Sequence, residues 1–316
     1  MGYDRYENCF AGVLYGSETG IPHVMRININ IVRQHERKPM RGLIVGAKRH
    51  PWMACVSWFA AFSVMWTLVE GLTHFLPGIP LKGSGTLLTI GAIGFVYAIW
   101  RIWQPTTIDI TIPHTNTRLT VCFGDLFAQI GYRAIAVSEY FESELGLPVS
   151  EKSLHGIFLK RCFGGHGESF DNIVNRELEG LASQTVATKK AGKQKKYPIG
   201  TTTLVPVNND RYLCFALCET DPVTCKVHAD VPMLWKALQG LWQKARVSSG
   251  GNALVLPLVG SGISGVGLEP MELLDLIILS VITETKRQQI TMQVRIVLTY
   301  DRFEDIDLRQ VQECWR

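Results

Sequence analysis

Two long apolar runs separated by a short loop constrain this 316-residue chain more than any other feature. Trp52–Val69 contains no charged residue, and Thr86–Trp103 contains only Arg101. A helix of this length spans roughly 27 Å at about 1.5 Å per residue, close to the hydrocarbon thickness of a bilayer. We therefore predict a transmembrane hairpin over residues 52–104, with its helices at 52–75 and 86–103. The alternative is a pair of helices buried in a water-soluble protein.

The basic residues near the first run predict its orientation. Six of them precede it: Arg33, Arg37, Lys38, Arg41, Lys48 and Arg49. Positively charged flanks favour the cytoplasmic side, and a second span returns the chain to that side. Trp52 and Trp103 would then lie at the same interface, where tryptophan is enriched. We expect a protein of the cell inner membrane with both termini cytoplasmic, and a cytoplasmic segment over 1–51 that includes a strand pattern at His23–Arg33.

The hairpin contains two polar residues on one helical face and a set of small residues on another. Glu70 and His74 share one helical face, so they would line a pore, pair across protomers, or lie at the outer interface. Gly94 and Ala98, with Gly91 one turn earlier, offer a small-residue face for contact between helices.

The second informative stretch is Ala253–Gly267, in which a buried strand leads into a glycine-rich loop. Glycines let the backbone turn tightly, and free N–H groups beside a helix N-terminus can hold phosphate. The spacing also fits the dinucleotide fingerprint, but only ~50 residues follow, too few for the βα units of a Rossmann domain. The pattern predicts a pyrophosphate cradle in another α/β fold. The alternative is a surface turn without a ligand.

Composition excludes several classes of site. A net charge of +4 is too mild to imply nucleic acid. Eight cysteines are present, but none forms a C-x-x-C pair. A zinc site built from Cys214, Cys218, Cys225 and His228 fits no standard spacing, so we expect no metal and no cofactor.

Beyond the hairpin, strand and helix patterns alternate as in an α/β domain, over residues 105–302, before a charged tail at 303–316. The predicted strands are Arg118–Phe123, Ala134–Val137, Thr201–Val207, Arg211–Cys218, Ala253–Val259 and Met292–Thr299. The predicted helices are Leu154–Arg161, one that starts at the N-cap Asp230, and Met271–Thr285. The basic segment Lys189–Lys196 is expected as a solvated surface loop; the alternative is contact with anionic lipid or a phosphate-bearing ligand.

Two motifs make the region from Ile108 to Arg302 resemble a macro domain, a three-layer α/β/α fold with a mixed sheet that binds ADP-ribose. Gly124-Asp125-Leu126 is similar to the Gly-Asp-Ile of that family, in which the Asp accepts a hydrogen bond from the adenine amino group. Val259–Gly265 is similar to the family's late glycine loop, which wraps the diphosphate and the distal ribose. The resemblance implies these ligand-binding residues: Gly124, Asp125, Leu126, Gly260, Ser261, Gly262, Ile263, Ser264 and Gly265.

One part of the family pattern is absent. Many macro domains carry an Asn-Ala-Ala-Asn run after the strand that corresponds to Ala134–Val137, where it holds the distal ribose and, in hydrolases, positions the catalytic water. This chain has Ser138-Glu139-Tyr140 there, and Lys152–Gly156 where a Gly-Gly-Gly segment is usual. We therefore expect a protein that is not an enzyme and has no catalytic residue. We also expect an altered pocket at the distal ribose, as a modified ADP-ribose would need.

A membrane hairpin followed by a divergent macro domain is similar to the membrane effectors of type II Thoeris anti-phage defence. The resemblance implies a signal derived from ADP-ribose, joined to histidine and made by a partner enzyme with a TIR domain. It further implies a homo-oligomer in the lipid bilayer that disrupts the membrane and causes abortive infection. Two alternatives stay open: a membrane-tethered ADP-ribosyl hydrolase using Glu139, Glu142 or His155, and a passive anchor that recruits ADP-ribosylated partners.

Overall fold

The computed structural model describes residues 38–76, 78, 83–262 and 265–315, and it divides into two compact units, Met1–Trp103 and Gln104–Arg316. The strand expected at His23–Arg33 lies outside the described residues, as do Ile263 and Ser264 of the glycine loop. Each unit is considered by itself.

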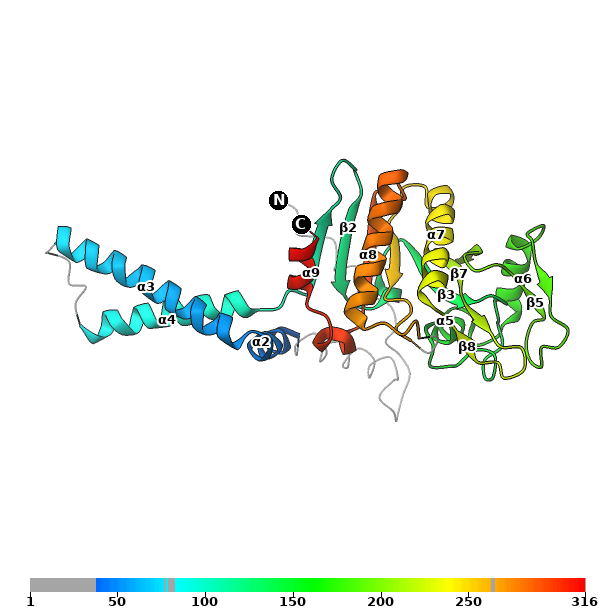
Figure 1. Ribbon diagram of the computed structural model, residues 1–316, viewed down its shortest axis with the longest axis horizontal. Helices are drawn as coiled ribbons and strands as arrows, with labels where there is room; N and C mark the ends of the chain where they lie inside the picture. The colour runs from blue at the N-terminus through cyan, green and yellow to red at the C-terminus, as the bar shows by residue number, and fades with distance from the viewer. Residues whose placement is uncertain (1–37, 77, 79–82, 263–264, 316) are drawn as a thin grey trace, which may run out of the picture. The chain divides into compact units, whose positions relative to one another are not determined.

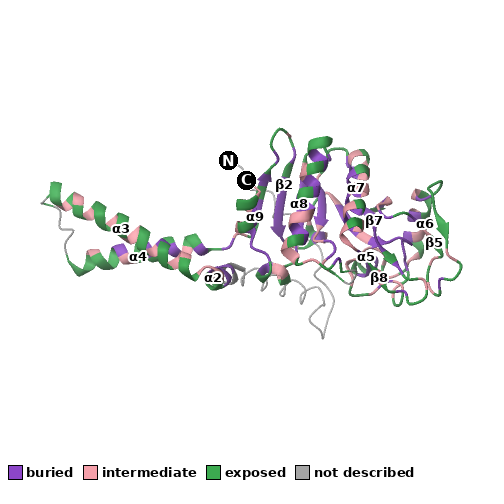
Figure 2. Ribbon diagram, viewed as in Figure 1, coloured by how far each residue is buried: buried purple, intermediate pink, exposed green. Residues whose placement is uncertain are grey.

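Three helices make up the described part of the first unit: α2 (Lys38–Arg49), α3 (Pro51–Phe75) and α4 (Ser84–Ile102) (Figure 1). The most apolar 18-residue windows of α3 and α4 are only 6% and 22% buried. Their apolar side chains therefore form an exposed surface, seen as green ribbon in Figure 2. Core helices of a soluble protein would be mostly buried, so α3 and α4 are two candidates for membrane spans by length, composition and exposure.

The two long helices pack through small residues of α4, as the sequence predicts. Ile90, Gly94, Ala98 and Ile102 repeat every four residues and are buried. Gly94 receives Trp58 of α3, since a Cβ at Gly94 would lie 3.2 Å from the indole Cδ1. The indole Nε1 donates to the carbonyl oxygen of Gly91, at 3.1 Å. This contact fixes where the two helices cross.

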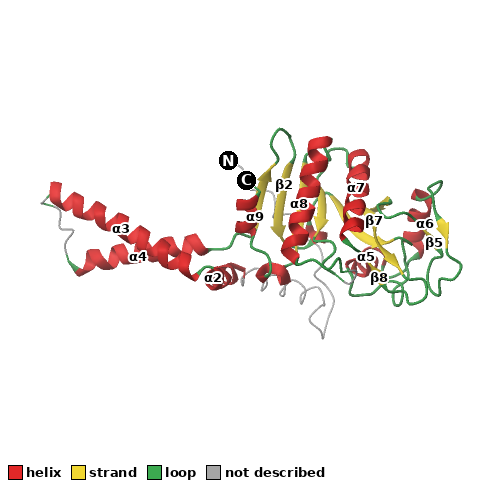
Figure 3. Cartoon of the chain, in the orientation of Figure 1, coloured by secondary structure: helices red, strands yellow, loops and turns green. Residues whose placement is uncertain are grey.

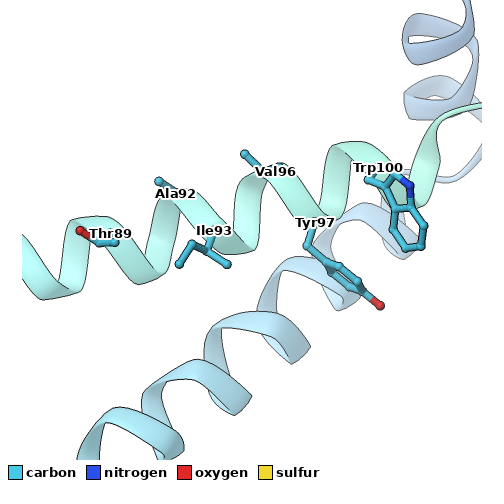
Figure 4. A pocket seen from close by; sticks show the side chains of 6 residues that line it. All are labelled: Thr89, Ala92, Ile93, Val96, Tyr97 and Trp100. Carbon is cyan, nitrogen blue, oxygen red and sulfur yellow. The ribbon is translucent and has the colours of Figure 1, made fainter. Parts of the chain in front are cut away.

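Another side of α4 carries an apolar hollow of about 480 Å³. It is lined by Thr89, Ala92, Ile93, Val96, Tyr97 and Trp100 (Figure 4).

The second unit is built on a mixed sheet with the strand order β1-β2-β10-β9-β3-β7-β6, and β8 pairs with the end of β7. The strands are β1 (Thr107–Thr111), β2 (Arg118–Phe123), β3 (Tyr132–Ser138), β6 (Thr202–Val207), β7 (Asp210–Thr220), β8 (Val227–His228), β9 (Leu254–Pro257) and β10 (Gln293–Leu298). The five central strands run parallel to one another; they are β2, β10, β9, β3 and β7. The outer strands β1 and β6 are antiparallel to their neighbours. A separate ribbon pairs β4 (Gln184–Thr185) with β5 (Lys195–Lys196).

Helices cover both faces of this sheet (Figure 3). They are η1 (Leu126–Ala128), α5 (Leu154–Phe163), α6 (Glu168–Glu177), α7 (Val231–Ser248), α8 (Pro270–Arg287), η2 (Tyr300–Glu304) and α9 (Leu308–Cys314). Phe158 of α5 and Phe170 of α6 join the core on the face that carries Ile135 and Val137 of β3. On the other face α7 packs beside α8, where the Trp242 indole donates to Ser280 Oγ at 2.8 Å. The result is the three-layer α/β/α arrangement expected from the sequence.

The last residues differ from the expected charged tail. In α9, which contacts β1, Leu308 and Val311 are buried. The Trp315 indole donates to Asp275 Oδ1 of α8, at 2.8 Å. Apolar residues three apart on one helical turn supply this anchorage, so α9 is part of the second compact unit.

Candidate ligand-binding site

The carboxyl ends of the five parallel strands lie along one edge of the sheet, which is where open α/β folds bind ligands. β2 leads there into Gly124-Asp125-Leu126, and β9 leads into the glycine loop at Gly260. β10 ends next to Tyr300, and β3 continues into Glu139 and Tyr140. The fold therefore brings both predicted motifs to a common edge, although 134 residues separate Leu126 from Gly260 in the chain.

Asp125 is held in place but stays accessible. Its Oδ1 accepts a hydrogen bond from the N–H of Phe127, at 3.0 Å, and so caps η1. Its Oδ2 lies 3.3 Å from Arg161 Nη1, and 53% of the side chain is exposed. Arg161 also lies over the Phe127 ring, 4.7 Å from its centroid. A carboxylate oriented in this way can accept a further hydrogen bond from an adenine amino group.

The neighbours of Asp125 in the motif both make contacts within the fold. Leu126 is buried in the core, and the Gly124 N–H donates to the Leu298 carbonyl of β10, at 2.8 Å. A Cβ at Gly124 would lie 3.3 Å from the side chain of Gln129. Both residues therefore hold Asp125 in position, a role that the motif alone does not reveal.

The glycine loop is fixed at its start and open at its tip. Gly260 has a φ of +87°, and a Cβ there would lie 2.7 Å from Val266 Cγ2. The Val266 N–H donates to the Gly260 carbonyl at 3.0 Å, and Gly265 N–H donates to Gly262 at 3.1 Å. Within the described part of the chain, the N–H groups of Ser261 and Gly262 donate to no other group. These are the donors that an anion-binding loop presents.

Arg302 adds a positive charge to this loop. Its Nη2 donates to the Ser261 carbonyl at 3.3 Å, and its Nη1 pairs with Asp305 at 3.2 Å. Arg302 is not among the site residues predicted from the sequence, where it marks the end of the domain. Its place could have been found from topology, since residues that follow the last parallel strand must lie at the same edge.

Aromatic side chains also gather at this edge. Phe123, at the end of β2, lies 5.9 Å from Tyr300 and 4.9 Å from Phe303, measured between ring centroids. Both partners lie in η2, directly after β10. Phe123 and Phe303 are buried, so the cluster ties the end of β2, two residues before Asp125, to η2.

At the end of β3, polar groups are buried. Glu139 is 5% exposed, and this burial raises its pKa above the usual value, against the opposing effect of Lys196 at 3.7 Å. Among the described residues, the hydroxyl of neighbouring Ser138 has no hydrogen-bond partner. The register of β3 against β7 shifts between Val137 and Ser138. Because of this bulge, regular pairing with β7 is interrupted where Ser138-Glu139-Tyr140 begins, the segment that stands in place of the family's Asn run.

The basic segment Lys189–Lys196, here called the lysine arm, is only in part the solvated loop that we expected: Lys190 and Lys195 are exposed, but Lys189 is buried. Lys189 forms an ion pair with Glu142 that is almost fully buried, and its ammonium group lies 4.5 Å above the Tyr140 ring. Lys193 pairs with Asp171 of α6, and its N–H donates to Glu142 at 3.0 Å. The expectation fails at Lys189 and Lys193, whose acidic partners lie far from them in the sequence.

The lysine arm, α6 and the β3 exit enclose a pocket of about 440 Å³. Its polar lining includes Tyr140, Asp171, Asn175, Lys193 and Tyr197. Tyr140 lies two residues beyond the end of β3, so the pocket adjoins the ligand edge of the sheet on the side of β3 and β7. It offers aromatic surface together with both signs of charge.

Neither Glu142 nor His155 is placed as a general base. Glu142 is occupied by Lys189 and by the N–H of Lys193. His155 is buried, which together with Lys193 lowers its pKa to about 3. Among the described residues its Nε2 has no partner, and no group of three His, Cys, Asp or Glu could hold a metal ion.

A family model described as the macro domain of Thoeris protein ThsA matches residues 119–299. The chain belongs to this ThsA macro-domain family. The matched ThsA segment begins in β2 and ends just after β10, so it contains both motifs, whereas α3 and α4 lie outside it. It confirms the membership that the two motifs and the hairpin predicted.

Solved structures show a more distant likeness to this ThsA-family chain. A macrodomain from Oceanobacillus iheyensis with MES bound has 12% sequence identity and a TM-score of 0.45, covering 66% of this chain and 96% of that one. The same macrodomain with ADP has 12% identity, a TM-score of 0.43 and the same coverage. No curated protein matches the chain. Because the TM-scores fall below 0.5, membership of the ThsA family rests on the family match.

Proposed function

We propose that this chain is an effector of anti-phage defence whose macro domain senses an ADP-ribose-derived signal. The signal is histidine-linked ADP-ribose, made from NAD by a partner TIR-domain enzyme. The observation that carries the proposal is the common edge of the sheet at which an accessible carboxylate, Asp125, and the free N–H groups of Ser261 and Gly262 follow their strands. This combination matches the two ends of an adenosine diphosphate group.

The strand order supports a particular pose for the ligand. Asp125 accepts from the adenine amino group, and the N–H groups of the glycine loop hold the diphosphate. Arg302, which contacts Ser261, adds a positive charge beside the phosphates. The distal ribose then points toward the β3 exit, and the group attached to it enters the pocket between Tyr140 and the lysine arm. Asp171 and Lys193 in that pocket suit a group with both an amine and a carboxylate.

Sensing is favoured over hydrolysis by the surroundings of the acidic residues. A hydrolase needs a base placed near the distal ribose, and Glu142 is neutralised by Lys189. Glu139 keeps the second candidate function open, because it is a buried carboxyl group at the end of β3 and burial raises its pKa above the usual value. Incubation of the protein with ADP-ribosylated substrate tests this directly: release of ADP-ribose by wild type and not by Glu139→Gln would establish hydrolysis.

We further propose that α3 and α4 cross the cell inner membrane and that ligand binding makes copies of the chain oligomerise and disrupt it. A ligand can shift an equilibrium only by binding one state more tightly than the other, so the signal must favour the oligomeric state. The alternative is a passive anchor that recruits ADP-ribosylated partners, which would bind the same ligand without membrane damage.

The decisive experiment uses the full chain. Titration calorimetry in detergent compares ADP-ribose with its histidine-linked form, and dye-filled liposomes report leakage. We expect tighter binding of the histidine-linked form, and leakage only when it is present. Asp125→Ala and Gly262→Asp should bind at least about tenfold more weakly and need correspondingly more ligand for leakage, whereas the exposed control Lys160→Gln should behave like wild type in both assays. Unchanged binding in both site variants would refute the site, and binding without leakage would leave only the passive anchor.

A further inference from the structure

The helix α2 immediately precedes the first candidate span but does not continue it. It ends at Arg49, and His50, with φ −126° and ψ 53°, breaks the helical path before Pro51 begins α3. At 12 residues α2 is about 18 Å long, too short to cross a bilayer. It contacts both α3 and α4 within the first unit.

The apolar residues of α2 lie on two different faces. Gly42, Val45 and Gly46 are buried, and their spacing of three and four residues places them on one side of the helix. Ile44 is 55% exposed, and Ala47, three residues later on the other side, is also exposed. Ile44 and Ala47 therefore form an exposed apolar strip on the side of α2 that faces away from its buried residues.

The charge of α2 is entirely positive. Its sequence contains Lys38, Arg41, Lys48 and Arg49 and no acidic residue. The formal net charge of the whole chain is +4, so the charges of the remaining residues cancel. Lys48 is exposed at the end of the helix, one residue after Ala47. The apolar strip therefore lies beside concentrated positive charge, which is the pattern of a helix that lies in a membrane interface.

The place of α2 in the chain indicates which surface it meets. α3 begins and α4 ends at the same end of the hairpin, where Trp52 is 79% exposed and Trp103 is 40% exposed. Tryptophan marks the level of the lipid head groups. Since α2 is joined to this end of α3, it lies at that level whenever α3 spans the membrane.

We propose that α2 lies in the head-group layer and binds anionic phospholipids. Ile44 and Ala47 enter the acyl boundary, while Lys48 contacts lipid phosphates. This proposal rests on the membrane-spanning assignment of α3 and α4. Each basic residue near an anionic surface strengthens association about fivefold, so the charge of one 12-residue helix is sufficient to select anionic lipid.

The test uses the full chain in nanodiscs of phosphatidylcholine alone and in nanodiscs that contain an equal part of phosphatidylglycerol. Hydrogen exchange followed by mass spectrometry reports α2 and α3 separately. We expect α2 amides to exchange at least about tenfold more slowly in the anionic discs, and α3 amides to be protected in both. Lys48→Glu and Ile44→Asp should each remove the difference at α2.

Matched controls are Lys286→Glu, at an exposed lysine in the last turn of α8, and Ile130→Asp, at an apolar residue that is 86% exposed in the second unit. Both should exchange like wild type at α2. Equal exchange of α2 in the two lipids, with α3 still protected, would overturn the lipid site alone. Unprotected α3, or a chain that does not enter the discs, would overturn the membrane assignment as well.

Discussion

Lys189 pairs with Glu142 in the interior of the protein, where the two side chains keep 1% and 2% of their surface exposed. Forty-seven residues separate them in the chain. Glu142 also accepts from the N–H of Lys193, so both of its carboxylate oxygens are used. The pair ties the lysine arm to the segment that follows β3, and in doing so it shapes the pocket beside Tyr140.

Breaking this pair should destabilise the protein strongly. Removing one partner leaves a buried charge without compensation, which costs about 3–5 kcal/mol. Lys189→Met and Glu142→Gln should each lower the unfolding temperature of the full chain in detergent. The double variant should lose less than the sum of the two, because neither charge is then left alone. Lys160→Gln, which breaks the exposed pair with Glu151, should leave the unfolding temperature unchanged. Equal effects at both pairs would contradict the buried pairing.

Asp125 should matter through its charge and its free acceptor capacity. Losing a hydrogen bond to a charged acceptor weakens binding by about 10- to 100-fold, and we expect that range for Asp125→Ala with the ADP-ribose derivative. Asp125→Asn keeps an acceptor for the Phe127 N–H, so it separates loss of ligand contact from loss of the η1 cap. Arg161→Gln removes the neighbouring guanidinium and should bind nearly as well as wild type. Calorimetry of the three variants measures how much ligand affinity each one loses.

Two glycines of the loop should respond differently to substitution. Gly260→Ala forces a Cβ against Val266 at a φ of +87°, so it should lower both stability and ligand affinity. Gly262 is exposed, and no other described atom lies within 4 Å of a Cβ placed there. Gly262→Ala should therefore fold normally, and Gly262→Asp should fold but repel the diphosphate. Thermal unfolding together with calorimetry distinguishes these outcomes, and a destabilised Gly262→Ala would contradict the open tip.

His155 should make stability depend on pH. Burial lowers its pKa to about 3 in the folded protein, so between that value and 6.5 the unfolded chain binds the extra proton. Stability is complete above pH 6.5 and is lost as pH falls, by up to about 1.4 kcal/mol per pH unit. His155→Phe, which suits the contact with Phe170 at 5.8 Å between ring centroids, should unfold with a shallower dependence from pH 7 to 5. Parallel curves would show that His155 does not titrate in this way.

The regular elements could be predicted where local signals agree. Arg118–Phe123 is observed as β2 with the predicted bounds, and Asp230 caps α7 as expected from its side chain and the following Pro. α6 was missed because its sequence is mostly polar. Phe170 and Val174, four residues apart and both buried, carry the helical signal that a closer reading of the pattern would have found.

The site was harder to predict, because its residues meet through tertiary contacts. Two glycine motifs indicated the edge, yet nothing near Lys189 in the sequence indicates that Glu142 neutralises it. Arg302 likewise reaches Ser261 across 41 residues. A lysine-rich segment is usually solvated, and only the fold shows which lysines are covered. The local sequence pattern therefore predicts the glycine loop but not the charged residues of the site, such as Arg302 and Lys189.

Trp103 is the last residue of the first unit, and only Gln104–Thr106 separate it from Thr107, the first residue of β1. A link of this size reaches at most about 14 Å even when fully stretched. If α4 is held in a bilayer, the second unit stays close to the membrane surface. Copies of the chain would then meet within a thin layer, where a modest number of molecules amounts to a high local density.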